Sequence, residues 1–453
     1  MEKKENIRQL AVEMVMEITQ GREYSHILIR NVLDKYAYLP SFDRAFLKKV
    51  TEGTIERQIT IDYILNRFSK VPASKMKPFI RSLMRTSVYQ IMYLDKVPDS
   101  AVCNEAVKLA AKRGFGSLKG FVNGVLRTIV RNKDDIPYPD KTENPIAAFS
   151  VLYSMPETIT EILVKQYGIE TAEQILKGYF TERPVCVRVS QKLSEAQKEE
   201  LLANWERLGI TVKVHPWLPY AYELTQSGNI KNDENFTKGH YAIQDISSML
   251  VCEIAGIREN DYILDVCSAP GGKALHACDK LNGNGVVDAR DVSDNKVQLI
   301  LENKKRLHAD SLQVKLWDAR IKDESVINKA DVLLMDIPCS GLGIMGRKPE
   351  IRYRLTEKAF AELAVLQKEI ADTVWEYVKP GGTLIYSTCT LRKEENEQMV
   401  SYLMKQYGFT LESLNPYLPE GLHNDDTKKG YLTLLPTESS DGFFMARLKR
   451  NIK

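Results

Sequence analysis

The most informative segment of the 453-residue chain is Tyr262-Ile-Leu-Asp-Val-Cys-Ser-Ala-Pro-Gly-Gly-Lys273, a β-rich run followed at once by a turn with two glycines. Four more short β-rich runs follow it, and helical stretches separate them. Alternating strands and helices are typical of an α/β fold with a doubly wound parallel sheet. The predicted strands are residues 262–267, 285–289, 312–316, 331–335 and 382–386, and the predicted helices are residues 272–281, 293–307 and 359–378.

The turn after the first of these strands predicts a ligand site. Two adjacent glycines at the start of a helix let the backbone approach a ligand closely. The Gly-x-Gly-x-x-Gly spacing of dinucleotide sites is absent. A phosphate-binding P-loop needs glycine at position 267 and serine or threonine at position 274, where this chain has Cys267 and Ala274. The alternative ligand is S-adenosylmethionine, whose amino-acid part lies over such a turn.

Two carboxylates follow the next strands. Asp291 ends the second predicted strand, 26 residues after Asp265, close to the usual spacing of about 20 residues. A carboxylate at that point accepts hydrogen bonds from ribose hydroxyls in nucleotide-binding doubly wound folds. Asp318 follows the third strand and is a weaker third contact, placed to reach the adenine.

Cysteines follow the fourth and fifth predicted strands. The fourth strand ends in Asp336-Ile-Pro-Cys339, and the fifth ends in Ser387-Thr-Cys389. The usual role of a single cysteine is to pack in the core. Two cysteines at the carboxyl ends of consecutive strands, one of them following an acidic residue, favour catalysis.

Thiols at this place suit methyl transfer to cytosine, because C5 of cytosine is a poor nucleophile. Addition of a thiolate at C6 makes C5 enamine-like, and the adduct resolves by loss of the C5 proton and of the thiol. The thiolate needs a lowered pKa or a nearby base. Asp336 is placed to hydrogen-bond the ring at N3 and N4. The residues alone leave open whether Cys339 or Cys389 attacks.

The N-terminal part of the chain is predicted to be helical and basic. Residues 67–131 contain 13 Lys and Arg but 3 Asp and Glu, a local charge of +10 against +3 for the whole chain. Such a charge suggests a polyanionic partner, and a solvated helical surface is the alternative. One apolar helix face contains Phe79 and Leu83, with Arg81 and Arg85 facing elsewhere. The candidate RNA contacts are Arg81, Arg85, Lys112 and Arg113.

Prolines and acids between residues 132 and 145 indicate a first linker. Helical and strand patterns mix after it, which suggests a small α+β module. We therefore predict a multidomain protein with three domains. They are an all-α domain over residues 1–135, an α+β module over residues 145–238 and an α/β domain over residues 239–453.

The composition argues against several classes of protein. The seven cysteines are odd in number and none forms Cys-x-x-Cys, so we expect no disulfide framework and no zinc or other metal site. No run approaches the ~18 apolar residues of a membrane span. No apolar signal-peptide core follows Met1. These features predict a cytoplasmic protein that binds no membrane, and we expect a monomer.

Three motifs together resemble the RNA 5-methylcytosine methyltransferases of the RsmB/Nop2 family. They are Ala269-Pro-Gly-Gly-Lys273, Asp336-Ile-Pro-Cys339-Ser-Gly and Ser387-Thr-Cys389. Gly239-x-Tyr-x-x-Gln-Asp-x-Ser-Ser248 is similar to the segment before their first strand, and Asp441-Gly-Phe-Phe-Met-Ala446 to their final strand. The basic half, with Val102-Cys-Asn-Glu-Ala-Val107 and Phe121-Val-Asn-Gly-Val-Leu126, is similar to the RNA-binding factor NusB.

The resemblance implies a Rossmann-like domain that uses S-adenosylmethionine. It implies that Cys389 is the nucleophile, that Cys339 helps to release the product, and that Asp336 and Lys273 border the target base. The implied cofactor contacts are Cys267, Ser268, Ala269, Pro270, Gly271, Gly272, Lys273, Asp291, Asp318 and Asp336. The chain departs from the family pattern in small ways, with Ser268, Ala274, Trp317 and Ile337 where other residues are common.

The resemblance implies C5 methylation of one cytosine in 16S rRNA or a small-subunit precursor. One alternative is a methyltransferase that acts on another acceptor, such as tRNA or protein. Another is a non-catalytic RNA-binding assembly factor, although binding alone needs neither thiol.

Overall fold

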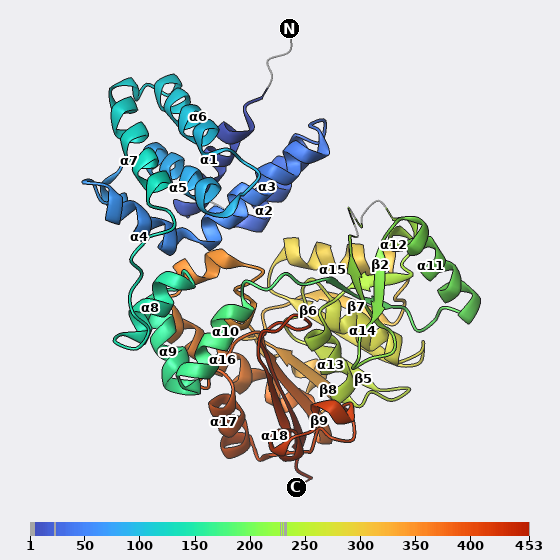
Figure 1. Cartoon of the computed structure of the whole chain (residues 1–453). Coiled ribbons are helices and arrows are strands. Elements are labelled where there is room, and N and C mark those ends of the chain that lie inside the picture. Colours follow the sequence, from blue (N-terminus) through green and yellow to red (C-terminus); the bar gives the residue numbers. More distant parts are fainter. Residues whose placement is uncertain (1–4, 22–23, 227, 229, 231–232, 453) are drawn as a thin grey trace. The chain divides into compact units, whose positions relative to one another are not determined.

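The computed structural model describes residues 5–21, 24–226, 228, 230 and 233–452, which fall into two compact units (Figure 1). The helical unit is residues 1–177 with 347–354, and the sheet unit is residues 178–346 with 355–453. Residues 145–177 thus group with the N-terminal helices, and residues 178–238 group with the large sheet. The division into three domains stays a prediction. The prediction that no signal-peptide core follows Met1 partly concerns residues 1–4, and these lie outside the described residues.

The helical unit is built around α5 (Pro78–Tyr93), whose residues 82–91 are all buried. Its core includes Leu83, Met84 and Val88, packed with residues from the surrounding helices. The other helices of the unit are α1 (Ile7–Thr19), α2 (Ser25–Lys35), α3 (Ser41–Glu56), α4 (Gln58–Phe68), α6 (Asp99–Lys112), α7 (Lys119–Arg131), α8 (Pro145–Leu152), α9 (Glu157–Tyr167) and α10 (Ile169–Gly178). This arrangement confirms the predicted all-α N-terminal region.

A short segment from late in the chain completes the helical unit. It contains the 3-10 helix η6 (Pro349–Tyr353). Arg352 is buried and donates to the carbonyls of Glu56 and Ser154, at 3.2 and 3.0 Å. The Tyr353 hydroxyl donates to the Ile55 carbonyl at 2.8 Å. Because the carbonyls of Ile55 and Glu56 lie in the last turn of α3, the segment satisfies acceptors that this helix leaves open.

A small antiparallel sheet opens the sheet unit. Its strand order is β2-β3-β1-β4, with β1 (Val185–Val189), β2 (Thr211–Val214), β3 (Ala221–Thr225) and β4 (Tyr241–Ile243). Helix α11 (Glu195–Arg207) begins at Ser194, whose side chain and that of Gln197 form a capping box. Trp205 of this helix is fully buried against the sheet. The region thus contains both strands and a helix, as its mixed pattern predicts.

The large sheet is mixed, and its main path runs β10-β12-β9-β8-β5-β6-β7. The five strands from β9 to β7 are parallel, which confirms the predicted doubly wound core, and β12 pairs antiparallel with β9. The strands are β5 (Tyr262–Asp265), β6 (Val286–Asp291), β7 (Leu312–Leu316), β8 (Ala330–Asp336), β9 (Val378–Thr388), β10 (Phe409–Leu411), β11 (Tyr431–Leu434) and β12 (Phe443–Arg450).

Helices cover this sheet, and those near residues 272–281, 293–307 and 359–378 were predicted, whereas the helices over residues 246–255 and 397–407 were not. They are α13 (Ile246–Ala255), α14 (Gly272–Lys280), α15 (Asp294–Arg306), α16 (Glu357–Val374) and α17 (Glu397–Tyr407), with the short α12 (Glu234–Thr237) and α18 (Asp425–Lys429) in loops. Apolar residues of α13 and α14, such as Leu250 and Leu275, share one core with Ile263 of β5. The parallel strands place their carboxyl ends along one edge, where all the predicted catalytic residues lie.

Candidate active site

Two thiols meet at the carboxyl ends of β8 and β9. The strands are parallel neighbours, and their register pairs Asp336 with Ser387. Cys339 and Cys389 follow those residues by three and two positions, and their Sγ atoms lie 3.2 Å apart. The sequence predicted that both thiols lie at this edge, and the structure brings them into contact.

Polar contacts fix the loops that carry the thiols. The Ser340 amide donates to Glu395 Oε2 at 2.8 Å, and Ser340 Oγ and Thr390 Oγ1 are 2.7 Å apart. Gln367 Nε2 donates to both Glu395 Oε2 and the Pro338 carbonyl, at 3.0 and 2.9 Å. Glu395, Gln367 and Thr390 are fully or almost fully buried. Sequence reasoning missed these three supports, because their contacts with the Pro338–Ser340 loop join residues that are far apart in the sequence.

The two thiols differ from the cysteines of the core. Cys339 and Cys389 are partly exposed, whereas Cys252 and Cys278 are buried. Burial raises the pKa of Cys252 to about 12 and that of Cys278 to about 11. The pKa of Cys339 is also raised, first by its hydrogen bond with Cys389 and then by burial. A raised pKa favours the protonated form of the Cys339 thiol.

Beside the thiols, Asp336 is held from both sides. Lys273 Nζ, from the first turn of α14, donates to Asp336 Oδ2 at 2.6 Å. Ser387 Oγ donates to Asp336 Oδ1 at 2.8 Å. Burial lowers the pKa of Lys273, but the ion pair with Asp336 and the charge of Asp265 outweigh burial, and the pKa is raised. Lys273 is therefore a fixed cation that orients Asp336.

Asp265 is a buried carboxyl group that the sequence did not mark as a site residue. It ends β5 and is 1 % exposed. Neither of its oxygens has a hydrogen-bond partner among the residues that the structure describes, and the same holds for Ser268 Oγ. Burial, and then the charge of Asp336, raise the pKa of Asp265 to about 7. The signal in the sequence was an acid at the last position of a strand before a glycine turn.

The turn from Cys267 to Lys273 fits the amino-acid part of S-adenosylmethionine. Gly271 has φ +97° and precedes the N-terminus of α14, where free amide groups attract a carboxylate. The buried oxygens of Asp265 and Ser268 without partners suit an ammonium group. A Cβ atom added at Gly272 would meet nothing within 4 Å. The turn thus offers hydrogen-bond acceptors, hydrogen-bond donors and open space for a ligand.

Asp291 lies next to this turn and joins it to β6. The Ala269 amide donates to Asp291 Oδ2 at 3.2 Å, and the Ser268 amide donates to the Arg290 carbonyl at 2.8 Å. The Trp317 amide donates to the Asp291 carbonyl at 3.0 Å, so the segment that contains Asp318 starts beside Asp291. The structure therefore places the turn, Asp291 and Asp318 along the ends of β5, β6 and β7, in the order predicted.

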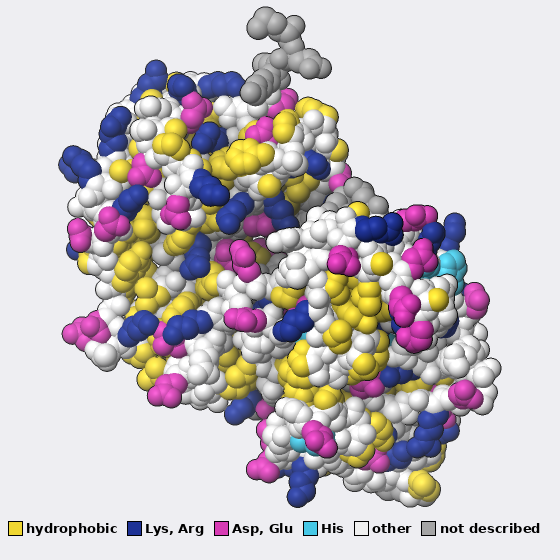
Figure 2. Space-filling view, turned by 45° about the vertical axis from the view of Figure 1, so that its right-hand side comes forward, with side chains coloured by type: hydrophobic (Ala, Val, Ile, Leu, Met, Phe, Trp, Pro, Cys, Tyr) yellow, Lys and Arg dark blue, Asp and Glu magenta, His cyan; other side chains and the backbone are white. Residues whose placement is uncertain are grey.

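The four candidate RNA contacts have different surroundings. Lys112 and Arg113 are exposed on the helical unit; Lys112 donates to Gln9 and Arg113 pairs with Glu13. Arg81 is partly buried. Eleven of the 13 basic residues between 67 and 131 are exposed, and Figure 2 shows basic side chains spread over this unit with acidic ones between them.

The prediction that Arg85 contacts RNA is wrong, because its side chain is buried and does not face solvent. Its side chain is 7 % exposed and donates to Asp62 of α4, through Nε to Oδ1 at 2.8 Å and through Nη2 to Oδ2 at 2.6 Å. Helix α5 is buried on every side, so a position off the apolar stripe still lies inside the unit. We therefore withdraw Arg85 as an RNA contact.

Two absences concern only the described part of the chain. Within it, no helix is long and apolar enough to cross a bilayer. The same residues contain no group of three or more His, Cys, Asp or Glu side chains placed to hold a metal ion.

Comparisons with known proteins agree with this geometry. Residues 254–449 match the family model described as 16S rRNA methyltransferase RsmB/F, and residues 5–131 match the NusB family. Probable ribosomal RNA small subunit methyltransferase B of Bacillus subtilis (strain 168) is 34% identical over 452 residues, which is 99% of each chain. Ribosomal RNA small subunit methyltransferase B of Klebsiella pneumoniae (strain 342) is 28% identical over 99% of each chain.

Solved structures share the fold. The crystal structure of PH0851 superposes with a TM-score of 0.81 over 99% of this chain and 100% of that chain, at 21% identity. NSun6 from Pyrococcus horikoshii, solved with the S-adenosylmethionine analogue SFG, gives a TM-score of 0.57 over 67% of this chain and 100% of that chain, at 22% identity. The chain belongs to the ribosomal RNA small subunit methyltransferase B family, in which a NusB domain precedes an S-adenosylmethionine-dependent RNA methyltransferase.

Proposed function

We propose that the protein methylates C5 of one cytosine in 16S rRNA through a covalent adduct between Cys389 and C6 of the base. The observation that carries the proposal is the contact of Cys389 with Cys339, 3.2 Å between Sγ atoms, beside the Lys273–Asp336 ion pair. RNA binding alone requires neither a thiol pair nor a fixed carboxylate. Methyl transfer to an oxygen or an amino nitrogen has no use for a covalent sulfur adduct either.

The reaction begins when the Cys389 thiolate forms a bond to C6. The electron pair of the C5–C6 double bond moves toward the ring nitrogens, and N3 takes a proton. Asp336 accepts hydrogen bonds from N3–H and N4–H through the lone pairs that Lys273 and Ser387 leave free on its two oxygens. The protonated ring is thereby favoured and C5 becomes nucleophilic.

The bound cofactor supplies an electrophilic methyl group on a sulfonium sulfur, and C5 takes that methyl group. Cys267 to Lys273, Asp291 and Asp318 are the residues that hold the cofactor in this proposal. C5 then loses its proton to a base, the C5–C6 double bond returns, and the C6–S bond breaks to restore the thiolate of Cys389 while N3 gives back the proton that it took from solvent. The cofactor would leave as the neutral thioether, so one proton is released for each methyl group transferred.

Cys339 serves the release step in this account. Its raised pKa keeps it protonated, so it donates a hydrogen bond to the Cys389 sulfur. That bond stabilises the developing thiolate as the C6–S bond breaks. The family resemblance implies that Cys389 is the nucleophile and that Cys339 acts in release.

The base in a folded RNA lies in its stack and must leave the stack before a thiol can reach C6. Exposed cations of the helical unit, including Lys112 and Arg113, are proposed to hold the RNA backbone. Backbone contacts position the RNA without reading its sequence. The identity of the cytosine is therefore set by contacts to bases near the thiol site.

Product analysis tests the proposal. Purified 16S rRNA, small-subunit precursor and tRNA are incubated with S-adenosylmethionine and each protein variant, and nucleosides are identified by mass spectrometry. We expect 5-methylcytosine at one 16S rRNA position with the wild type and with Cys103→Ala, a buried thiol of the helical unit. Cys389→Ala is expected to give none. A methylated product other than 5-methylcytosine, or full activity of Cys389→Ala, would overturn the proposal.

A further inference from the structure

The backbone on both sides of Cys339 is bonded to one pair of side chains, Gln367 and Glu395. Gln367 Nε2 donates to the carbonyl of Pro338, the residue before Cys339, at 2.9 Å. The amide of Ser340, the residue after Cys339, donates to Glu395 Oε2 at 2.8 Å. Gln367 Nε2 also donates to that Glu395 oxygen, at 3.0 Å. The pair therefore connects the two ends of the short segment that carries this thiol.

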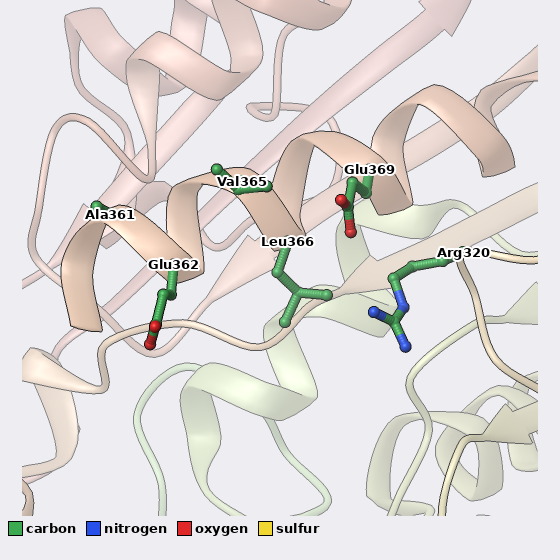
Figure 3. Close-up of a pocket in the computed structure, with 6 residues that line it drawn as sticks. All are labelled: Arg320, Ala361, Glu362, Val365, Leu366 and Glu369. Atoms are coloured by element: carbon green, nitrogen blue, oxygen red, sulfur yellow. The ribbon is translucent and has the colours of Figure 1, made fainter. Parts of the chain in front are cut away.

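Both side chains of the pair are enclosed, although the helix that carries Gln367 is partly exposed. Glu395 is 1% exposed and Gln367 is fully buried. Other side chains of α16, among them Glu362 and Glu369, line a shallow groove at the surface (Figure 3). Removing one partner of a buried hydrogen bond leaves the other partner without water to replace it. The loss of Glu395 or Gln367 therefore leaves the Cys339 segment with an unsatisfied polar group.

The segment that carries Cys389 is held by groups other than the Glu395 side chain. Thr388, the residue before Cys389, ends β9, and the register of β9 with β12 fixes its backbone. The Thr388 hydroxyl donates to Asn396 Oδ1 at 2.6 Å. Asn396 Nδ2 donates to the carbonyl of Thr390, the residue after Cys389, at 3.0 Å. Loss of the Glu395 side chain is therefore expected to loosen Cys339 and to leave Cys389 in place.

The charge of Glu395 acts on the same thiol as its hydrogen bonds do. The pKa of Cys339 is raised first by the hydrogen bond with Cys389 and by burial, and the charges of Cys389 and Glu395 add to these causes. A negative charge close to a thiol disfavours the thiolate. Glu395 therefore holds the backbone of Cys339 and also favours the protonated thiol, which is the form that the release step uses.

We propose that Glu395 is a positioning residue that holds the Cys339 thiol against Cys389 for the release of the methylated RNA. Gln367 completes this connection, because it bonds both Glu395 and Pro338. The inference rests on the proposed function, in which Cys389 forms the adduct and Cys339 assists the breaking of the C6–S bond. It adds that release of the adduct depends on Glu395, whereas formation of the adduct does not.

Single-turnover methylation of 16S rRNA tests the inference, because it separates formation of the adduct from its release. Samples are denatured at successive times, and the protein that is joined to RNA is measured by gel electrophoresis. Glu395→Ala is expected to slow release about 10- to 100-fold, since a displacement of about 1 Å at a reacting group can cost about 10²-fold. Adduct formation should keep its wild-type rate. The adduct should therefore accumulate although both thiols are present.

Four further variants separate positioning from a general loss of structure. Glu395→Gln keeps an oxygen that can accept both hydrogen bonds, so its release rate should lie between those of Glu395→Ala and the wild type. Gln367→Met removes both donated bonds and should slow release as Glu395→Ala does. Glu369→Met changes an exposed side chain of the same helix and should behave like the wild type. Adding Glu395→Ala to Cys339→Ala should slow release no further, because both changes act on one step.

A bifunctional bimane reagent, which fluoresces only after both of its ends have reacted with thiols, reports the thiol pair without RNA. The wild type and Glu369→Met should become fluorescent, and Cys339→Ala should not. Glu395→Ala should react at least about tenfold more slowly than the wild type, because its two thiols are no longer held together. Peptide mass spectrometry identifies the bridge between Cys339 and Cys389. This readout does not depend on methyl transfer.

Release at the wild-type rate in Glu395→Ala or in Gln367→Met would overturn the inference, and so would an equal loss of adduct formation and release. In those cases an adduct that accumulates in Cys339→Ala still supports the proposed function. Absence of an adduct from every variant, Cys339→Ala included, would overturn the proposed function and this inference with it. Failure of the inference and failure of the proposed function are therefore distinguishable.

Discussion

The charged residues of the two units are organised in different ways. In the sheet unit, Asp336, Lys273 and Asp318 each have a charged partner at a fixed distance, and the register of β8 with β9 sets the place of Asp336. In the helical unit, most of the basic residues are exposed. The difference shows that chemistry requires fixed partners, whereas attraction to a polyanion requires only a suitable density of charge.

The largest effect that we predict concerns the ion pair at the thiols. Asp336→Asn keeps the shape of the side chain but removes the charge that favours the protonated cytosine ring. We expect kcat to fall about 10²- to 10⁴-fold, the range for a positioned acid–base group. Rates of methyl transfer to rRNA measure it. Asp310→Asn, an exposed aspartate, is the control. A loss of less than about threefold would remove Asp336 from the mechanism.

The second prediction concerns the buried acid next to that pair. The pKa of Asp265 is about 7 in the folded protein and about 3.9 in an unfolded chain. Between these values the folded state binds more protons, so the free energy of unfolding decreases as pH rises, by up to ~1.4 kcal/mol per pH unit. Below about pH 4 and above about pH 7 this group contributes no slope.

Denaturant unfolding at pH 5, 6 and 7 checks this dependence. Asp265→Asn removes the titrating group, so its unfolding free energy should vary less with pH than that of the wild type in this window. Asp310→Asn should behave like the wild type. Parallel pH profiles for Asp265→Asn and the wild type would show that Asp265 does not titrate between pH 4 and 7.

The third prediction separates a buried cation from an exposed one within the helical unit. Arg85→Ala leaves the carboxylate of Asp62 without the partner that lies 2.6 Å away. Breaking a buried pair costs about 3–5 kcal/mol, and the partial exposure of Asp62 reduces the loss to about 2–3 kcal/mol. Lys112→Ala should change stability by less than about 0.5 kcal/mol. Thermal unfolding measures both, and equal losses would contradict the distinction.

The smallest effect concerns RNA affinity. Replacing Lys112 and Arg113 together by alanine removes two exposed positive charges. If both contact phosphate, the slope of log K against log salt becomes less steep by about 1 to 2. Filter binding of 16S rRNA at several salt concentrations measures the slope. An unchanged slope would make these two residues part of a solvated surface.

The sequence predicted the edge of the sheet on which the site lies, because parallel strands align their carboxyl ends. It placed Cys339, Cys389 and Asp336 there from motif positions alone. It did not predict that Lys273 and Ser387 hold Asp336 from opposite sides, since those contacts depend on how α14 packs and on the register of β8 with β9.

Two residues show where sequence patterns stop being informative. Asp265 has a perturbed pKa because of what covers it, and covering elements cannot be read from a local pattern. Arg85 lies off the apolar stripe of its helix, but α5 is enclosed on all sides and Asp62 of α4 neutralises the arginine. Periodicity reports which face of a helix is apolar, and it does not report whether the other faces are also covered.

The same limit applies to the domain boundaries. The prolines after residue 132 indicated a linker, yet residues 145–177 group with the helical unit. The late segment at residues 347–354 groups with that unit too, through Arg352 and Tyr353. Contacts between residues far apart in the sequence determine which segments form one compact unit. A single sequence does not show those contacts directly.

The central claim is that the two thiols have different roles, and trapping the RNA adduct tests it most directly. Each variant is incubated with 16S rRNA and S-adenosylmethionine, denatured, and examined by gel electrophoresis and mass spectrometry for protein joined to RNA. We predict that Cys339→Ala accumulates a denaturation-resistant adduct at Cys389 and that Cys389→Ala forms none. An adduct in Cys389→Ala, attached through Cys339, would contradict the account.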